Sequence, residues 1–152
     1  MKKGMMNFRI PLVFAVLLIP AVVEAESINV WPDQLKPVNP TVAHMQSADE
    51  ARNGLFYAPI YPRVGAKIVK VTYYHLGARP PALTAAKLMR VKMGEVPQKL
   101  ADKSSSDSTG EIILVDVPIT GEPFVKPDYR YYLSIESSNE NSFFMGAKVT
   151  YH

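Results

Sequence analysis

The chain has 152 residues, of which 47% are hydrophobic and 20% charged, so it is sized for one folded domain and is not disordered by composition. It has no cysteine, which excludes disulfide bonds, thiolate metal sites and a cysteine nucleophile. The formal net charge is +3, but three basic residues and one acidic residue lie within the first 25 positions, so the remainder carries only about +1. A nucleic-acid partner is therefore not expected.

The N-terminal segment Met1–Ala25 has the pattern of a secretory signal peptide. Two lysines and an arginine precede an apolar run over 10–23, and cleavage is expected after Ala25, with Ala21 as the second choice. The alternative is an uncleaved membrane anchor, but the run is short of the roughly 20 residues that a span needs and is broken by Pro20. The pattern predicts a secreted or periplasmic protein with no stable membrane span after cleavage.

Residues 26–52 are expected to form an extended leader with one or two short edge strands. Pro32, Pro37 and Pro40 interrupt regular strand pairing in this segment. The single tryptophan, Trp31, follows a short apolar run. A large aromatic side chain beside a strand is usually buried, so we expect it to fill the core, and a platform for a ligand is the alternative.

Six later stretches alternate apolar and polar residues with the period of two that a half-buried strand requires. They are 54–58, 67–75, 88–93, 111–119, 129–137 and 143–152. The polar stretch 94–108 is expected to be a loop. The last two stretches are joined by a polar Ser/Asn/Glu segment and predict an antiparallel hairpin.

The alternation also predicts which side of each strand faces the core. The inward residues are expected to be Val69, Val71, Tyr73, Met89, Val91, Met93, Ile113, Val115, Val117, Ile119, Tyr131, Leu133, Ile135, Phe143, Met145, Ala147, Val149 and Tyr151. Lys70 and Tyr74 then lie on the outward side of one strand, and Arg90 and Lys92 on the outward side of another.

These elements predict an all-β fold, because no run is long and periodic enough for a stable helix. About seven or eight half-buried antiparallel strands pack as two sheets face to face, in a jelly-roll-like β-sandwich or, as the alternative, an immunoglobulin-like one. We assign the sandwich domain to residues 53–152.

Turn and core residues follow one another along this domain in a characteristic order. They are Gly54-Leu-Phe-Tyr57, Pro62-x-x-Gly65, Ile68-x-x-Val71-x-Tyr73-Tyr74, Leu88-x-Arg90, Tyr131-Tyr132-Leu133 and Gly146-x-Lys-Val149-x-Tyr151. The order resembles that of small secreted bacterial β-sandwich proteins of jelly-roll type, many of them without an assigned function. The resemblance covers roughly residues 55–152, implies a fold and an extracellular setting, and carries no catalytic residue over.

The chain shows no catalytic signature, so we expect a non-enzymatic protein without a cofactor or metal. His44, His75 and His152 lack the close spacing of zinc motifs and are expected on the surface at strand ends. There is no Gly-x-Ser-x-Gly elbow. Paired carboxylates for glycoside hydrolysis remain open as a minor alternative, because Asp116 and Glu136 lie on strands whose outward faces could meet.

One basic segment stands out between Arg52 and Lys92, with eight basic residues and no acidic one. If the strands of this segment are neighbours, Lys70, Tyr74 and Arg90, together with Lys92, form a cationic surface with an aromatic ring in it. Such a surface suits an acidic glycan, lipid head groups or an acidic protein face. The alternative is that each cation pairs with an acid of the same molecule.

These features favour an exported, non-enzymatic protein that acts by binding or assembly. Its partner would be a second copy of itself, another extracellular protein or an acidic glycan. The alternative function is a glycan-binding, lectin-like module with aromatic contacts from Trp31, Tyr61, Tyr74 or Tyr132. A glycan-active hydrolase is less favoured.

Overall fold

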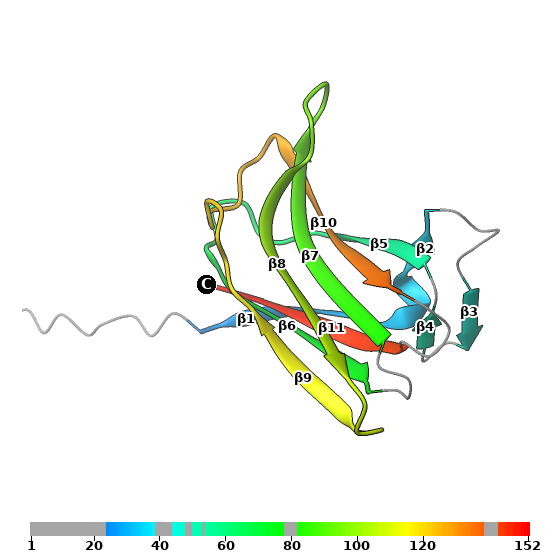
Figure 1. The fold of residues 1–152 in the computed structure, drawn as a ribbon. Coiled ribbons are helices and arrows are strands. Elements are labelled where there is room, and N and C mark those ends of the chain that lie inside the picture. Colours follow the sequence, from blue (N-terminus) through cyan, green and yellow to red (C-terminus); the bar gives the residue numbers. More distant parts are fainter. Residues whose placement is uncertain (1–23, 39–43, 48–49, 53, 78–81, 139–142) are drawn as a thin grey trace, which may run out of the picture.

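The computed structural model describes residues 24–152 except for 39–43, 48–49, 53, 78–81 and 139–142 (Figure 1). All but the last two residues of the predicted signal peptide, 1–25, therefore lie outside the described residues. Within the part of the chain that is described, no helix is long and apolar enough to cross a membrane.

Eleven strands of the described chain form two antiparallel sheets that face each other (Figure 1). Sheet A contains β1 (Glu26–Val30), β3 (His44–Ser47), β4 (Glu50–Arg52), β6 (Ile68–Leu76), β9 (Ile112–Val117) and β11 (Phe143–Tyr151). Sheet B contains β2 (Lys36–Pro37), β5 (Gly54–Ile60), β7 (Ala82–Lys92), β8 (Gln98–Asp107) and β10 (Tyr129–Ser137). A short 3₁₀ turn, η1 (Pro32–Gln34), connects β1 to β2.

The strand order is that of a jelly roll. In sheet A, β1 and β6 flank β11, and β9 lies outside β6. In sheet B, β5 and β7 flank β10, and β8 lies outside β7. The predicted fold class, an all-β sandwich of two antiparallel sheets, is confirmed, and the order matches the jelly roll rather than the immunoglobulin-like alternative.

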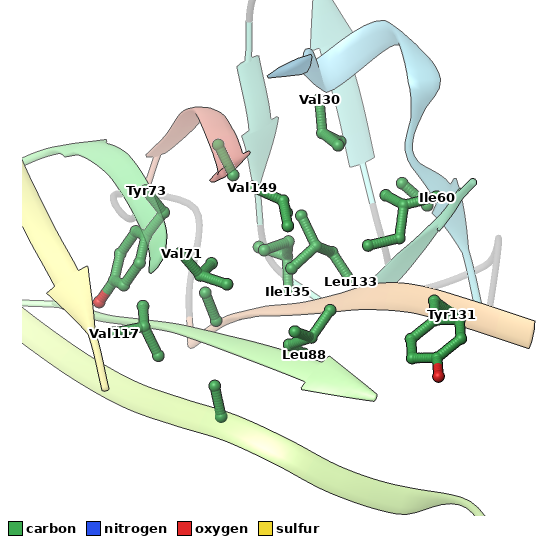
Figure 2. Packing of buried hydrophobic residues seen from close by; sticks show 14 of the residues in the cluster. Val30, Ile60, Val71, Tyr73, Leu88, Val117, Tyr131, Leu133, Ile135 and Val149 are labelled. Atoms are coloured by element: carbon green, nitrogen blue, oxygen red, sulfur yellow. The ribbon is translucent and has the colours of Figure 1, made fainter. Parts of the chain in front are cut away.

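The core lies between the sheets and is built from alternate residues of each strand. Figure 2 shows Val71 and Val149 of sheet A pointing toward Leu133 and Ile135 of sheet B, and all four side chains are fully buried. The faces predicted for β9 and β10 are confirmed, because their inward residues are buried or half-buried. Each buried side chain of this size stabilises the fold by roughly 1.5–3 kcal/mol.

Two hydrogen bonds from β6 link the sheets inside the core. Tyr73 donates from its hydroxyl to the carbonyl oxygen of Thr84 at 2.9 Å, and burial raises the pKa of the Tyr73 phenol. His75 places Nε2 3.0 Å from Oγ of Ser105 and is only 1% exposed. The predicted surface position of His75 is therefore wrong. Burial lowers the pKa of this imidazole, so the neutral form is favoured in the fold.

The predicted hairpin between 129–137 and 143–152 does not form. β10 pairs with β5 and β7 in sheet B, whereas β11 pairs with β1, β4 and β6 in sheet A. The chain crosses from one sheet to the other between these strands. Both strands bury one face in either arrangement, so the alternation of residues cannot distinguish a hairpin from a crossing.

The faces predicted for β7 are reversed. Leu88 and Arg90 point into the protein, while Met89 and Val91 lie half-buried on the outer side. Apolar residues occupy both sides of this strand, so hydrophobicity alone could not choose between them. Register settles the question, because Leu88 lies opposite the buried Leu133 of β10.

The polar stretch 94–108 was expected to be a loop, but most of it forms β8, the edge strand of sheet B. Leu100 and Ala101 are buried, and the rest of the strand is largely polar. An edge strand with one face in water needs few apolar residues, and polar side chains help to prevent edge-to-edge pairing with other molecules. The prediction was wrong because it required a longer apolar alternation.

Candidate functional site

Strands β1, β11, β6 and β9 bring polar and aromatic residues into two rows on the outer face of sheet A. The first row, in this strand order, is Asn29, Lys148, Thr72 and Asp116. The second row contains Gly146, Tyr74 and Leu114, and Trp31, which follows β1, lies beside Gly146.

Trp31 is 58% exposed, so the expectation that it fills the core is wrong. Val30 points inward and is buried, and the alternation of a strand turns the next residue outward. The backbone N–H of Trp31 donates to Oε1 of Gln34 at 2.9 Å, and its carbonyl accepts from the N–H of Gln34 at 3.0 Å. This reciprocal turn fixes the backbone that presents the exposed indole.

Gly146 lies at a β-bulge in β11 and has a φ of +146°, a conformation that other residues rarely adopt. A Cβ atom at this position would lie 3.4 Å from the carbonyl oxygen of Val30 and 3.5 Å from Cε3 of Trp31. Gly146 pairs with Tyr74 on its other side. Because it has no side chain, the space between Trp31 and Tyr74 is open at its floor.

The same bulge explains why the faces predicted for β11 are correct only after it. Ala147 and Val149 are buried as predicted. Before the bulge, Phe144 is fully buried, whereas Phe143 and Met145, which were expected in the core, are only half-buried. One extra residue in a strand reverses the side on which its neighbours lie.

The result is an open groove of about 480 Å³. Its lining consists of Asn29, Trp31, Tyr74, Ile112, Met145, Gly146, Ala147 and Lys148. Aromatic and aliphatic side chains form most of this surface, and the side chains of Asn29 and Lys148 supply polar groups. Such a combination is typical of sites that bind small molecules or segments of a polymer.

Next to the groove, one acid already has two partners. Asp116 accepts hydrogen bonds from the ammonium group of Lys70 at 3.0 Å and from the hydroxyl of Thr72 at 2.9 Å. These two partners hold the pKa of the Asp116 carboxyl below its ordinary value. Lys148, by contrast, forms no ion pair with any residue that the structure describes.

The four residues predicted to share a cationic surface do not lie together. Lys70 and Tyr74 belong to β6 of sheet A, while Arg90 and Lys92 belong to β7 of sheet B. The premise that the two strands are neighbours is therefore wrong, because consecutive strands of this sandwich can belong to opposite sheets. Tyr74 lines the groove and Lys70 engages Asp116 beside it. A binding role for the four residues stays a prediction.

Arg90 points into the protein and links its own strand to neighbouring strands of sheet B. Its side chain is 8% exposed, and its guanidinium lies 4.7 Å from the centre of the Tyr129 ring. Nε donates to Oε1 of Gln98 at 3.0 Å, and Nη2 lies 3.5 Å from Oε2 of Glu122, which also pairs with Lys126. Nη1 is buried without a partner among the described residues. These contacts connect β7, β8 and β10, so Arg90 is not the surface cation that was predicted.

Three further cations of the basic segment pair with acids of the same molecule. The pairs are Lys92 with Glu95 at 3.8 Å, Lys87 with Glu136 at 3.3 Å and Arg63 with Glu26 at 3.6 Å. Exposed pairs of this kind contribute only about 0–1 kcal/mol each to stability. They do, however, offset much of the positive charge that would attract an acidic partner to this segment.

Asp116 and Glu136, the carboxylates considered for glycoside hydrolysis, lie on the outer faces of opposite sheets. Each pairs with a lysine, Asp116 with Lys70 and Glu136 with Lys87. The minor alternative that their outward faces meet does not hold, because β9 and β10 belong to different sheets. Among the described residues, no group of three or more His, Asp or Glu side chains could hold a metal ion.

Two other hollows meet at Tyr61, which is 83% exposed. One, of about 520 Å³, extends toward Val64 and Tyr129. The other, of about 380 Å³, extends toward Gln34. Tyr61 is therefore a second exposed aromatic residue beside a hollow, and it offers a matched comparison for Trp31.

Reasoning from the sequence missed most of the groove residues, among them Asn29, Gly146 and Lys148. Gly146 offered a signal, because a glycine inside an alternating strand often marks a bulge or the close approach of another group. Asn29 and Lys148 offered none. Their proximity depends on the pairing of β1 with β11, two strands at opposite ends of the described chain.

No family model and no curated protein sequence matches the chain. Among solved structures, its fold is similar to that of the Clostridium thermocellum N-terminal endo-1,4-β-D-xylanase 10B, CBM22-1 and GH10 modules, complexed with xylohexaose. The TM-score is 0.54 at 11% identity, and the match covers 84% of this chain but only 28% of that one. At this identity the likeness shows the β-sandwich fold alone.

A second solved structure, TmCBM61 in complex with β-1,4-galactotriose, matches over 84% of both chains. Its TM-score is 0.38 and its identity to this chain is 12%. A similarity this remote adds nothing to the assignment of the fold.

Proposed function

We propose that the protein is an exported, non-catalytic carbohydrate-binding module that holds a glycan in the groove on the outer face of sheet A. The observation that carries the proposal is the pair of aromatic side chains, Trp31 and Tyr74, on either side of Gly146. Two strand spacings separate β1 from β6, so their backbones are roughly 9–10 Å apart. This separation suits contact with more than one unit of a sugar chain.

The chemistry of the groove matches that of a sugar. A pyranose ring has apolar C–H faces and a rim of hydroxyl groups. The flat indole of Trp31 and the phenol ring of Tyr74 supply apolar contact area. Asn29 can donate and accept hydrogen bonds at the rim, and Lys148 can donate them. The groove therefore supplies both kinds of contact that a sugar requires.

Three further observations support the proposal. The signal-peptide pattern of 1–25 would deliver the protein to a compartment where polysaccharides occur. The similar β-sandwich fold occurs in a xylanase chain that carries a CBM22-1 module and was solved with xylohexaose, which provides a precedent. The separation of Asp116 from Glu136, each paired with a lysine, favours binding over hydrolysis.

The test is native electrophoresis of the purified protein in gels that contain xylan, galactan or polygalacturonate. We expect at least one polysaccharide to retard the protein, Trp31→Ala to abolish the retardation, and Tyr61→Ala to retain it. Tyr61 is the matched control because it is an exposed aromatic residue that does not line the groove. Migration unaffected by every polysaccharide, or retardation that survives Trp31→Ala, would overturn the proposal.

A further inference from the structure

Among the residues that the structure describes, Lys148 is the one charged residue that lines the groove. On β11 it lies directly opposite Asn29 of β1 on one side and Thr72 of β6 on the other. On an exposed sheet face, a lysine commonly faces an acid across the strands, which offsets its charge. Here both cross-strand neighbours are neutral, so no acid lies opposite the ammonium group.

Among the acids whose side chains the structure describes, those on this side of the molecule are engaged or lie outside the groove. Asp116 is two strands from Lys148, roughly 9–10 Å away at the backbone, and accepts from Lys70 and Thr72. Glu26 of β1 pairs with Arg63 at 3.6 Å. Asp33 and Glu111 lie close in sequence to groove residues, but neither belongs to the lining. The groove therefore combines two aromatic rings with one positive charge that no described acid neutralises.

From this arrangement we infer that the groove selects glycans that carry carboxylates, namely chains of uronic acids. The carboxylate of one sugar unit pairs with Nζ of Lys148, and the side-chain amide of Asn29 donates to the same group or to a hydroxyl beside it. Trp31 and Tyr74 hold the C–H faces of this unit and its neighbour. The inference rests on the proposed function and specifies its ligand class.

The faces of a uronic acid ring are apolar, and its carboxylate lies at the rim. One sugar unit can therefore pair with the lysine and at the same time pack against an aromatic side chain. A hydrogen bond between charged partners is shorter and stronger than one between neutral partners. Because Lys148 supplies a single positive charge, a singly charged carboxylate matches it. For one such contact, we expect the affinity for the acid to exceed that for its neutral form about tenfold.

Trp31 is the only tryptophan in the chain, so its fluorescence reports directly on the groove. The protein is titrated with oligomers of galacturonate and mannuronate, with their fully methyl-esterified forms, with neutral xylohexaose and with a sulfated oligosaccharide. The ester lacks the negative charge of the acid and carries one additional methyl group on each carboxyl group. We expect an acid oligomer to bind about tenfold more tightly than its ester, with a smaller difference at high salt.

The decisive variant is Lys148→Met, which removes the charge from an exposed position and is checked for folding by thermal denaturation. We expect it to lower affinity for the acid to that for the ester and to leave the ester unchanged. Lys92→Met is the matched control, because Lys92 is an exposed lysine on sheet B, and it should behave like the parent protein.

The possible failures separate the two claims. Equal affinity for acid and ester, or an acid preference that survives Lys148→Met, overturns the selection of carboxylates, while Trp31-dependent binding of a neutral glycan keeps the proposed function. Tighter binding of the sulfated oligosaccharide than of either uronate also overturns the carboxylate assignment. No fluorescence change with any glycan, together with unretarded electrophoresis, overturns both.

Discussion

The outer faces of the two sheets both present aromatic residues, but they differ in shape. Sheet A presents Trp31 and Tyr74 on either side of Gly146. Sheet B presents Tyr57, which is 40% exposed, on β5 and the half-buried Tyr132 on the adjacent β10. The presence of exposed rings therefore does not by itself distinguish the two faces.

The difference lies in what stands beside the rings. On sheet B, Tyr57 lies opposite Ser134 and Tyr132 lies opposite Met89, so side chains fill the intervening positions. Lys87 of that face pairs with Glu136, whereas Lys36 of β2, which lies opposite Tyr57, forms no ion pair with a described residue. On sheet A the intervening position is a glycine, and Lys148 lacks an acidic partner among the described residues. The missing side chain at Gly146, rather than the unpaired lysine, therefore distinguishes the groove from the aromatic surface of sheet B.

The largest effect is expected at Arg90, a basic residue of sheet B that points inward. Arg90→Ala removes the stack on Tyr129 and the hydrogen bond to Gln98, and it leaves a cavity. We expect the free energy of unfolding in urea to fall by about 2–3 kcal/mol. Lys92→Ala, an exposed position on the same strand, should change it by less than about 0.5 kcal/mol. Equal free energies of unfolding in the two variants would contradict the stabilising role assigned to Arg90.

The next largest effect compares one tyrosine from each face. Tyr74→Ala removes one wall of the groove, so we expect glycan affinity measured by calorimetry to fall about tenfold to thirtyfold. Tyr132→Ala removes a half-buried tyrosine from sheet B and should leave affinity unchanged. The opposite pattern would move the binding face to sheet B.

Filling the floor of the groove should have a smaller effect on binding. Gly146→Val places a branched side chain beside Trp31 and imposes an unfavourable φ on a residue with a Cβ atom. We expect about a tenfold loss of affinity, and a loss of about 1–2 kcal/mol in the free energy of unfolding. Ser134→Val, the comparable change on sheet B, should not affect affinity. Parent-like binding by Gly146→Val would show that the missing side chain does not create the site.

A graded effect of pH is expected from His75, which lies in the core behind the groove face of β6. Because burial lowers its folded-state pKa below the ordinary value of 6.5, the unfolded chain takes up this proton first as pH falls. The free energy of unfolding therefore keeps the full contribution of neutral His75 above about pH 6.5. It decreases as the pH falls from there through the lower folded-state pKa.

Urea denaturation from about pH 7.5 to pH 5 measures this slope. His75→Gln cannot titrate and can still bond to Ser105, so it should flatten the slope relative to the parent. An unchanged slope in this variant would assign the acid sensitivity to other groups.

The sequence carried enough information to predict the sandwich, because burial of one face imposes alternation on strands such as β9 and β10. Pairing was harder to predict. The polar segment between β10 and β11 is compatible with a hairpin and with a crossing between sheets, and only the crossing occurs. The alternation of residues gave the wrong inward face for β7, because Met89 and Val91 on one side are apolar like Leu88 on the other.

The candidate site was only partly predictable. Tyr74 was identified from its outward position, and it does line the groove. Trp31 was expected in the core because hydrophobic size alone favours burial, but the η1 turn and the orientation of Val30 place it outside. Lys148 became notable only through its neutral partners, Asn29 and Thr72, and these depend on pairing between segments distant in sequence.

The position of β11 also has a consequence for the order of folding. This strand holds sheet A together by pairing with β1, β4 and β6, yet it follows all three in sequence. During synthesis β1 and β6 are made before β11, so they cannot yet be joined in one sheet. Pairing between such distant segments is intrinsically slow to form. The floor of the groove at Gly146 is therefore completed only after β11 has been synthesised and has paired with β6.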